Sequence, residues 1–459
     1  MDMRMPVLDM VMESAAKASD FDGSNIVVLH VNHCMDNSFY FSEALKQIFH
    51  EVVFIGVPYN DKEVTPGYTF RYYYGKNKKG IYELYQGPKL FQITSQDFTE
   101  ATELLLERAM ERDILPHLRA GKKLLVIEDG GYHYKVLNRM AEKEPLLKTH
   151  MLGSVEQTTS GTVKCIDASK ENGYAYPCTS ISRSNIKMHV EARFIGHRVV
   201  EELSSFLYTA NTFLDFHNVL ILGYGIVGRR VARDLKGKRC QITVYDNDDF
   251  ISRIARAEGF RTASTITPEN FQKSTILIGN VGADVFPAEI LLAFLDGAAD
   301  SLYLASSSSQ DREFKTFINM TQEKIPFPEG VVLTEEIPEE FYTIYRLSYQ
   351  GRIKNVYLIA QGMPVNFYRK DVISLTYSII DLIFSEMLSM GITLCRDEHL
   401  PKKLYLLGED DGFMPFVSEE ELTELWFEKY DLSDGNDIQE ILDSHPFSGY
   451  LRDKLAQRS

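Results

Sequence analysis

The chain has 459 residues, 44% of them hydrophobic and 25% charged, as in ordinary globular proteins with two or three domains. Its net charge of −16 argues against a nucleic-acid groove or an anionic membrane surface as partner. The five cysteines are scattered and form no C-x-x-C pair, which is typical of a reducing cytoplasm and offers no framework for a metal. We therefore predict a cytoplasmic protein without a signal peptide, a metal site, or a nucleic-acid or membrane partner.

The first half of the chain alternates segments typical of strands with segments typical of helices. Strands are predicted at 26–31, 52–57 and 123–128, and helices at 38–50 and 100–113. Parallel strands are joined by crossover helices, so this alternation predicts a parallel sheet covered by helices. A polar, turn-rich stretch is predicted from 154 to 185, and a long helix from about 187 to 214.

A glycine-rich turn follows the apolar run that begins at Val219. The turn, residues 223–228, has the pattern G-x-G-x-x-G, and its candidate cofactor-binding residues are Gly223, Gly225, Ile226, Val227 and Gly228. A helical pattern and a second apolar strand, 241–245, follow, and that strand ends at Asp246. Strand, glycine turn, helix, strand and acid in this order predict a dinucleotide site: the glycines let the backbone approach a pyrophosphate, and the acid binds a ribose diol. Asn247 stands where a binder of 2′-phosphate more often has arginine, which favours NAD over NADP.

The alternation continues to about residue 333, with strands at 275–279 and 301–305. Segments 345–349 and 355–360 flank Gln350-Gly351 and predict a hairpin. The apolar stretch 372–390 contains Asp381 and Glu386, so we predict a buried or interface helix rather than a membrane span.

Together these elements predict an α/β fold with two doubly wound domains. The predicted domains are a discontinuous substrate domain at 1–195 and 360–398, an inserted NAD-binding Rossmann domain at 196–359, and a C-terminal extension of unknown role at 399–459. Such a layout predicts a small-molecule site in a cleft between domains.

Read together, four segments resemble motifs of the S-adenosylhomocysteine hydrolase family. These segments are Glu128-Asp-Gly-Gly-Tyr132, Glu156-Gln-Thr-Thr-Ser-Gly161, the glycine turn with its acid, and Gly362-Met-Pro-Val-Asn366. The resemblance extends from about residue 26 to 390. It implies a two-domain enzyme in which bound NAD oxidises a substrate hydroxyl and later reduces the ketone again, with proton transfers in between.

The resemblance assigns cofactor and proton-transfer roles to particular residues of this chain. Besides the glycine turn and Asp246, the cofactor residues it implies are Thr158, Thr159, Asn280, Gly282 and Asn366. Each of these could instead be an ordinary turn or cap residue. His33 stands at the family's proton-transferring histidine and Asp129 at its catalytic aspartate, although a loop histidine and an Asx turn would look alike.

The substrate half departs from the family pattern. The ribose-gripping glutamate is replaced by Gln157, the base lysine by Arg183, and the substrate aspartate by Lys187. Met188 and Ala192 replace the family's asparagine and cysteine. The loop Ser307-Ser-Ser-Gln-Asp311 lacks the family histidine, and Tyr368-Arg-Lys370 stands where a G-H-P segment is expected.

These replacements change the chemistry that the site can perform. Arginine stays protonated and cannot accept a hydroxyl proton, so hydrolysis of S-adenosylhomocysteine by the family route is disfavoured. The exchanges at 157, 183 and 187 make the predicted pocket three charges more positive. We therefore predict that Gln157, Arg183 and Lys187 bind a small anionic, hydroxylated substrate, with His33 or Asp129 as acid or base.

Two other functions fit the same residues. The chain could be a non-catalytic relative that binds NAD as a structural or regulatory ligand. An ordinary hydroxyacid or amino-acid dehydrogenase is the third reading, against which the segments at 128–132 and 156–161 argue. The family assembles as dimers of dimers, but its C-terminal lysine and tyrosine that reach a neighbouring subunit have no clear counterpart here, so a homodimer or homotetramer is expected.

Overall fold

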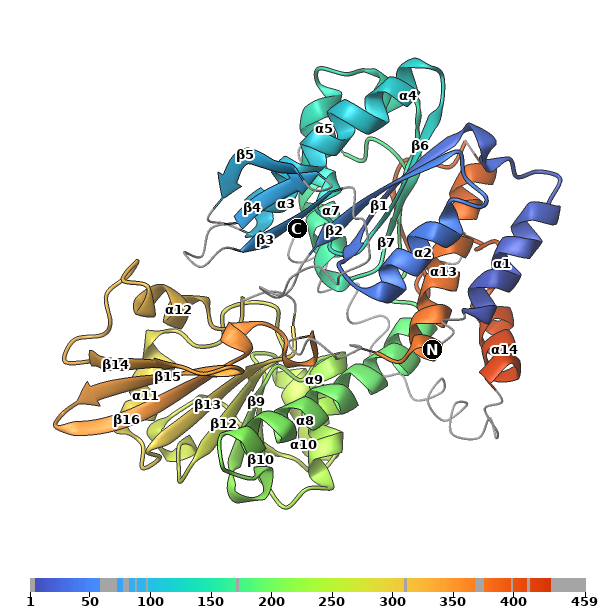
Figure 1. Ribbon diagram of the computed structural model, residues 1–459. Coiled ribbons are helices and arrows are strands. Elements are labelled where there is room, and N and C mark those ends of the chain that lie inside the picture. The colour runs from blue at the N-terminus through green and yellow to red at the C-terminus, as the bar shows by residue number, and fades with distance from the viewer. Residues whose placement is uncertain are drawn as a thin grey trace. The chain divides into compact units, whose positions relative to one another are not determined.

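The computed structural model of the chain divides into two compact units. The first comprises Met1–Glu191 with Thr376–Ser459, and the second Ala192–Leu375 (Figure 1). The structure describes residues 5–57, 72–76, 82–86, 89–95, 98–170, 173–308, 312–367, 375–397, 399–410 and 413–430. Each unit is an α/β layer structure.

The sheet of the first unit has the strand order β17-β8-β7-β6-β1-β2-β3-β4-β5 in the described residues. Its strands are β1 (Ile26–His33), β2 (Glu51–Val57), β3 (Tyr72–Lys76), β4 (Tyr82–Gln86), β5 (Lys89–Ser95), β6 (Lys123–Glu128), β7 (Met151–Glu156), β8 (Cys178–Ser180) and β17 (Leu404–Leu406). Pairing is parallel from β17 through β3, whereas β4 and β5 are antiparallel additions. The chain winds outward from β1 in both directions, so the strand order reverses between β1 and β6. In open α/β sheets, ligands bind at the carboxyl ends of the strands beside such a switch point.

Helices cover this sheet. They are α1 (Pro6–Lys17), α2 (Asp36–Leu45), α3 (Phe98–Ala109), α4 (Leu115–Arg119), α5 (His133–Ala141), α6 (Leu146–Thr149), α7 (Thr159–Ser169), the π-helix η3 (Ile186–Glu191), α13 (Tyr377–Arg396) and α14 (Glu419–Tyr430). The C-terminal segment, for which the sequence predicted no role, supplies β17 and α14 to this unit.

Helix α13 is the apolar helix predicted from 372–390. It is long and apolar enough to cross a membrane by composition, but 83% of its most apolar window is buried within the protein. Its two acids have partners in the core: Asp381 accepts hydrogen bonds from the backbone N–H groups of Val7 (3.0 Å) and Leu8 (2.8 Å), and Glu386 accepts one from Ser184 Oγ (3.0 Å). The polar residues that interrupt the apolar run thus cap α1 and hold η3, and α13 is the core helix of the unit.

The sheet of the second unit has the order β11-β10-β9-β12-β13-β16-β15-β14. Its strands are β9 (Asn218–Leu222), β10 (Gln241–Tyr245), β11 (Arg261–Ala263), β12 (Thr275–Gly279), β13 (Ser301–Ser306), β14 (Val332–Pro338), β15 (Tyr342–Tyr349) and β16 (Arg352–Ile359). The first six positions are all parallel and give the Rossmann order 3-2-1-4-5-6, with the switch point between β9 and β12. The helices are α8 (Ala192–Thr209), α9 (Ile226–Lys236), α10 (Asp249–Ala257), α11 (Ala288–Asp296) and α12 (Lys315–Thr321).

The predicted hairpin is confirmed. β15 and β16 pair antiparallel around Gln350 and Gly351, whose φ angles are 49° and 76°. Two successive positive φ angles match the right-handed twist of the flanking strands, which is why glycine stands at the second position.

Two element predictions were wrong in part, and some strands were not predicted. The stretch 154–185 is not mainly turns: it ends β7, forms α7 with Thr158 as N-cap, and forms β8. The helix from 187 begins as η3, and α8 ends at Thr209 rather than near 214. Strands β4, β5 and β14 were not predicted because these antiparallel additions have no crossover helix to mark them, and β3, which is parallel to β2, was not predicted either.

Candidate functional site

The glycine turn between β9 and α9 has the geometry that its sequence predicts. Gly223 has φ +91°, and a Cβ on Gly228 would lie 2.1 Å from the Gly223 carbonyl oxygen. Glycine at 228 therefore lets helix and strand pack in contact. A Cβ on Gly225 would meet no described atom within 4 Å, so the backbone there faces open space at the N-terminus of α9. Ile226 and Val227 form the first turn of that helix.

Asp246 directly follows β10 beside this turn. Its Oδ2 accepts a hydrogen bond from Tyr224 N (2.8 Å) and its Oδ1 one from Asp248 N (3.0 Å). Because a carboxylate has about four acceptor positions, both oxygens keep capacity for a ligand hydroxyl. Asn247 is exposed beside it.

The loop after β12 contains Asn280 and Gly282 and packs on the glycine turn. A Cβ on Gly223 would lie 2.7 Å from Val281 Cγ2, and one on Gly228 would lie 3.2 Å from Asn280 Cβ. Ser307, from the loop after β13, donates a hydrogen bond to Asn280 Oδ1 and one to the Gly279 carbonyl (3.1 Å). The two loops at the carboxyl ends of β12 and β13 are thus joined.

Asn366 lies in the same unit, in a short 3-10 turn at Val365–Phe367. Pro364 just before it forms a parallel bridge with Ser306 at the end of β13, which places the turn at the carboxyl edge of the sheet. The Asn366 side chain is buried, and its Oδ1 has no hydrogen-bond partner among the described residues. A buried amide oxygen without a partner is a candidate acceptor for a ligand donor.

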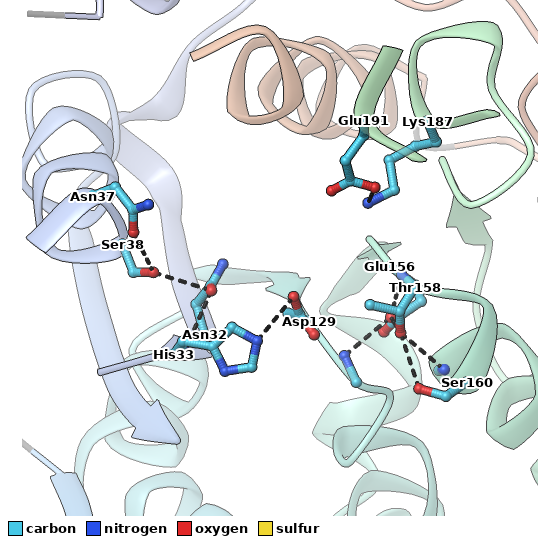
Figure 2. Close-up of polar contacts among 12 residues, drawn as sticks. Asn32, His33, Asn37, Ser38, Asp129, Glu156, Thr158, Ser160, Lys187 and Glu191 are labelled. Atoms are coloured by element: carbon cyan, nitrogen blue, oxygen red, sulfur yellow. Dashed lines mark hydrogen bonds and ion pairs between the residues drawn. The ribbon is translucent and has the colours of Figure 1, made fainter. Parts of the chain in front are cut away.

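In the first unit, His33 ends β1 and Asp129 directly follows β6, and these two strands flank the switch point. His33 Nε2 lies 3.4 Å from Asp129 Oδ2, and their side chains are only 11% and 7% exposed (Figure 2). Asn32 Oδ1 accepts a hydrogen bond from His33 N (2.7 Å) and one from Ser38 Oγ (3.1 Å), which fixes the end of β1. Burial by itself would raise the pKa of Asp129, but the nearby charges of His33, Lys187 and Lys164 hold it below its usual value.

Two glycine-containing loops support this pair. Gly130 and Gly131 have φ angles of 111° and 65°, and a Cβ on Gly131 would lie 2.5 Å from Gly161 Cα. Glu128, at the end of β6, accepts hydrogen bonds from Tyr132 N (2.6 Å) and His133 N (3.2 Å) and pairs with the His133 ring. The motifs at 128–132 and 156–161 can contact each other because each has a glycine, Gly131 and Gly161, at the point of contact.

The motif at 156–161 carries Glu156, which the sequence analysis did not assign. Its Oε1 accepts hydrogen bonds from Gly130 N (3.0 Å), Thr158 N (2.7 Å) and Thr158 Oγ1 (2.6 Å). Thr158 Oγ1 also accepts one from Gly161 N (3.0 Å), and so caps α7. Thr159 is exposed at the first turn of α7, and buried Gln157 has an Oε1 without a hydrogen-bond partner among the described residues. Cofactor contact by the two threonines stays a prediction.

Burial, together with the charges of Glu128 and Asp129, raises the pKa of Glu156 to about 8. The folded protein therefore holds a proton on this group that the unfolded chain releases near pH 4.5, so stability should fall as the pH rises from about 5 to 8. We expect Glu156→Gln to flatten this decline, which for one group is at most about 1.4 kcal/mol per pH unit. Urea unfolding of both proteins across this range measures it, and identical slopes would contradict the assignment.

Lys187 lies in η3 and forms an ion pair with Glu191. Both side chains are less than a tenth exposed, and in Figure 2 they extend from η3 toward the side of the unit that holds Asp129 and Glu156. Burial raises the pKa of Glu191, and the charge of Lys187 opposes that rise. The three added positive charges predicted from the sequence did not take Glu191 into account. Its spacing of four residues from Lys187 on a helix could have indicated the ion pair. Lys187 is thus charge-balanced within the protein.

Arg183 is buried at 8% exposure, in the turn between β8 and η3. Its Nη1 lies 3.9 Å from Met188 Sδ, and its Nε has no hydrogen-bond partner among the described residues. Burial lowers the pKa of Arg183 and the charge of Glu409 opposes that effect. No described contact joins Arg183 to His33 or Asp129. Ala192 begins α8 in the second unit, and residues 309–311 and 368–370 lie outside the described residues.

The fold and the sites define a class of protein: a Rossmann-type α/β unit joined to a second α/β unit with a buried His–Asp pair at its switch point. No protein-family model matches the chain. It is 23% identical over 291 residues to S-inosyl-L-homocysteine hydrolase of Methanopyrus kandleri, covering 62% of each chain. It is 24% identical to adenosylhomocysteinase of Aquifex aeolicus, covering 63% of this chain and 64% of that one.

Several adenosylhomocysteinase and S-inosyl-L-homocysteine hydrolase relatives at 23–24% identity support a divergent member of that family. The chain spans between three-fifths and two-thirds of the length of the Methanopyrus kandleri and Aquifex aeolicus relatives. Among solved structures, a 2-hydroxyacid dehydrogenase from Ketogulonicigenium vulgare Y25 is similar with a TM-score of 0.42 and 11% identity, covering 80% of this chain and 95% of that one.

Proposed function

We propose that the chain is an NAD-dependent enzyme that oxidises a hydroxyl group of a small anionic substrate. The observation that carries this proposal is the buried His33–Asp129 pair at the switch point of the first sheet. Perturbed, buried titratable groups at a switch point are typical of a catalytic site. A cytoplasmic location and assembly as a homodimer or homotetramer are part of the same proposal.

The second unit offers groups that fit a dinucleotide. The open side of Gly225 would admit the pyrophosphate at the N-terminus of α9, and Asp246 would accept hydrogen bonds from the ribose hydroxyls. The buried Oδ1 of Asn366 would accept a hydrogen bond from the nicotinamide carboxamide. When bound, NAD⁺ would accept a hydride from the carbon that bears the substrate hydroxyl.

Proton transfer falls to residues of the first unit. The imidazole of His33 would take the proton of the substrate hydroxyl, and the Asp129 carboxylate 3.4 Å away would stabilise the protonated ring. Arg183 cannot take this role because its guanidinium stays charged. The family route through a basic lysine at position 183 is therefore replaced here by a route through the His33–Asp129 pair.

The proposed anionic substrate rests on Arg183. Its guanidinium is buried, and its Nε has no described hydrogen-bond partner, so a carboxylate or phosphate could bind it with charge-assisted bonds. Lys187 is paired with Glu191, so it would contribute less to anion binding than its charge alone suggested. Gln157 offers an amide where a carboxylate would repel an anion.

Absorbance of the nicotinamide tests this proposal. Purified protein with NAD⁺ is mixed with hydroxylated candidates, beginning with S-inosyl-L-homocysteine, S-adenosyl-L-homocysteine and their anionic phosphate and carboxylate analogues. We expect an anionic candidate to produce the NADH band and Arg183→Ala to abolish turnover. An unchanged rate in Arg183→Ala would refute anion recognition by this residue.

A second candidate function is a non-catalytic NAD-binding or regulatory protein. The Lys187–Glu191 pair favours it, because two buried charges that neutralise each other need no substrate. In that case the bound cofactor would stay oxidised with every candidate, although NAD would still raise the thermal midpoint.

A further inference from the structure

Glu313 is a fully buried carboxylate of the second unit that no sequence motif identified. It lies between β13 and α12, two residues beyond the 307–311 loop. Its Oε1 accepts hydrogen bonds from Val281 N (2.8 Å), Gly282 N (2.7 Å) and Ser308 Oγ. One oxygen atom thus binds both loops at the carboxyl ends of β12 and β13.

The backbone around Glu313 holds the same loop. The Glu313 carbonyl accepts a hydrogen bond from Val285 N (2.8 Å), and Asp284 Oδ2 accepts one from Thr316 N (2.9 Å). A Cβ on Gly279 would lie 2.3 Å from Glu313 Oε2, so glycine at the end of β12 makes room for the carboxylate. Side chain and main chain together fix residues 281–285.

The loop that Glu313 holds lies against the glycine turn. A Cβ on Gly223 would meet Val281 Cγ2 at 2.7 Å and the Asn280 carbonyl carbon at 3.2 Å. In the Rossmann order, the strands that carry Asp246 serve the adenosine half, whereas β12, β13 and β16 lie beneath the other half of a dinucleotide. Glu313 therefore supports the side of the site opposite to Asp246.

We propose that Glu313 is a positioning residue that fixes the 280–282 loop for the nicotinamide half of NAD. This inference rests on the proposed NAD site. It adds that Asp246 serves the adenosine half of the dinucleotide and Glu313 the nicotinamide half. Glu313 acts through the loop amides and Ser308, and not by contact with the reacting atoms. Its hydrogen bonds are charge-assisted and buried, so removal of the carboxylate leaves two loop N–H groups without their acceptor.

The test compares NAD with AMP, which carries only the adenosine half, by calorimetry on nucleotide-free protein. We expect Glu313→Ala to raise the Kd for NAD by about tenfold or more, and to change the Kd for AMP by less than about twofold. Glu313→Gln, which keeps one acceptor oxygen, should lie between Glu313→Ala and the wild type. Glu289→Ala, an exposed acid in the first turn of α11, is the matched control and should bind both ligands as the wild type does.

Three results would overturn the inference, and they have different meanings. Unchanged NAD affinity in Glu313→Ala would show that the loop needs no carboxylate. Equal losses for NAD and AMP with a lower thermal midpoint would make Glu313 a support of the whole fold. A wild-type protein that binds neither ligand would refute the NAD site itself, and with it this inference.

Discussion

Asp129→Asn is expected to lower the rate of NADH formation by about 10²–10⁴-fold, the usual contribution of a positioned acid–base group. Asparagine keeps the shape of the side chain but removes the charge that lies 3.4 Å from His33 Nε2. The protonated imidazole then loses its stabilising anion in a buried setting. Stopped-flow absorbance with the substrate found in the nicotinamide screen measures the loss.

The control for this variant is Asp167→Asn, on the exposed face of α7, where the carboxylate forms a surface pair with Lys170. That change should leave the rate within a factor of about two, since such pairs contribute little. NAD affinity should be unchanged in both variants. A rate for Asp129→Asn equal to that of Asp167→Asn would exclude the His33–Asp129 pair from proton transfer.

Stability gives a second readout for Asp129. Because its folded pKa is lowered, its charged form stabilises the folded protein above the usual range of aspartate, near pH 4. That contribution is lost as the pH falls through the folded pKa. The stability difference between wild type and Asp129→Asn should accordingly shrink on acidification.

Gly228→Ala is expected to destabilise the second unit by about 1–3 kcal/mol and to abolish NAD binding. The new methyl group would lie 2.1 Å from the Gly223 carbonyl oxygen, which is backbone and cannot rotate away. Helix α9 must therefore move off β9, and the turn loses its shape. Thermal unfolding and calorimetry with NAD measure the two effects.

Gly225→Ala separates phosphate approach from helix packing. Its Cβ meets no described atom within 4 Å and its φ of −67° suits any residue, so the fold should keep its thermal midpoint. We still expect weaker NAD binding, because the methyl group would occupy the space that the pyrophosphate needs. Wild-type affinity in Gly225→Ala would contradict the placement of the phosphates at this turn.

The sequence was most informative where a function depends on neighbouring residues. The turn at Gly223–Gly228 follows from strand, glycines and helix in immediate succession, and Gln350-Gly351 predicts its hairpin in the same way. Both rest on backbone conformations that glycine adopts at low cost, and both are found in the structure. Thr158 was singled out for cofactor contact; the structure shows that it caps α7, the alternative role named for it, and cofactor contact stays a prediction.

The sequence by itself determined the Rossmann pattern, the hairpin at Gln350-Gly351 and the candidate residues at the ends of β1 and β6. Only the tertiary structure decided which of them meet. His33 and Asp129 become neighbours because parallel pairing of β1 with β6 brings two distant strand ends to one edge. The charge of Lys187 is balanced by Glu191. Glu313, which follows β13, accepts a hydrogen bond from a backbone amide of the loop after β12. Packing decides which residue pairs with a charge and which side chain holds a loop. The sequence pattern does not show these contacts, because it does not show which distant segments come together.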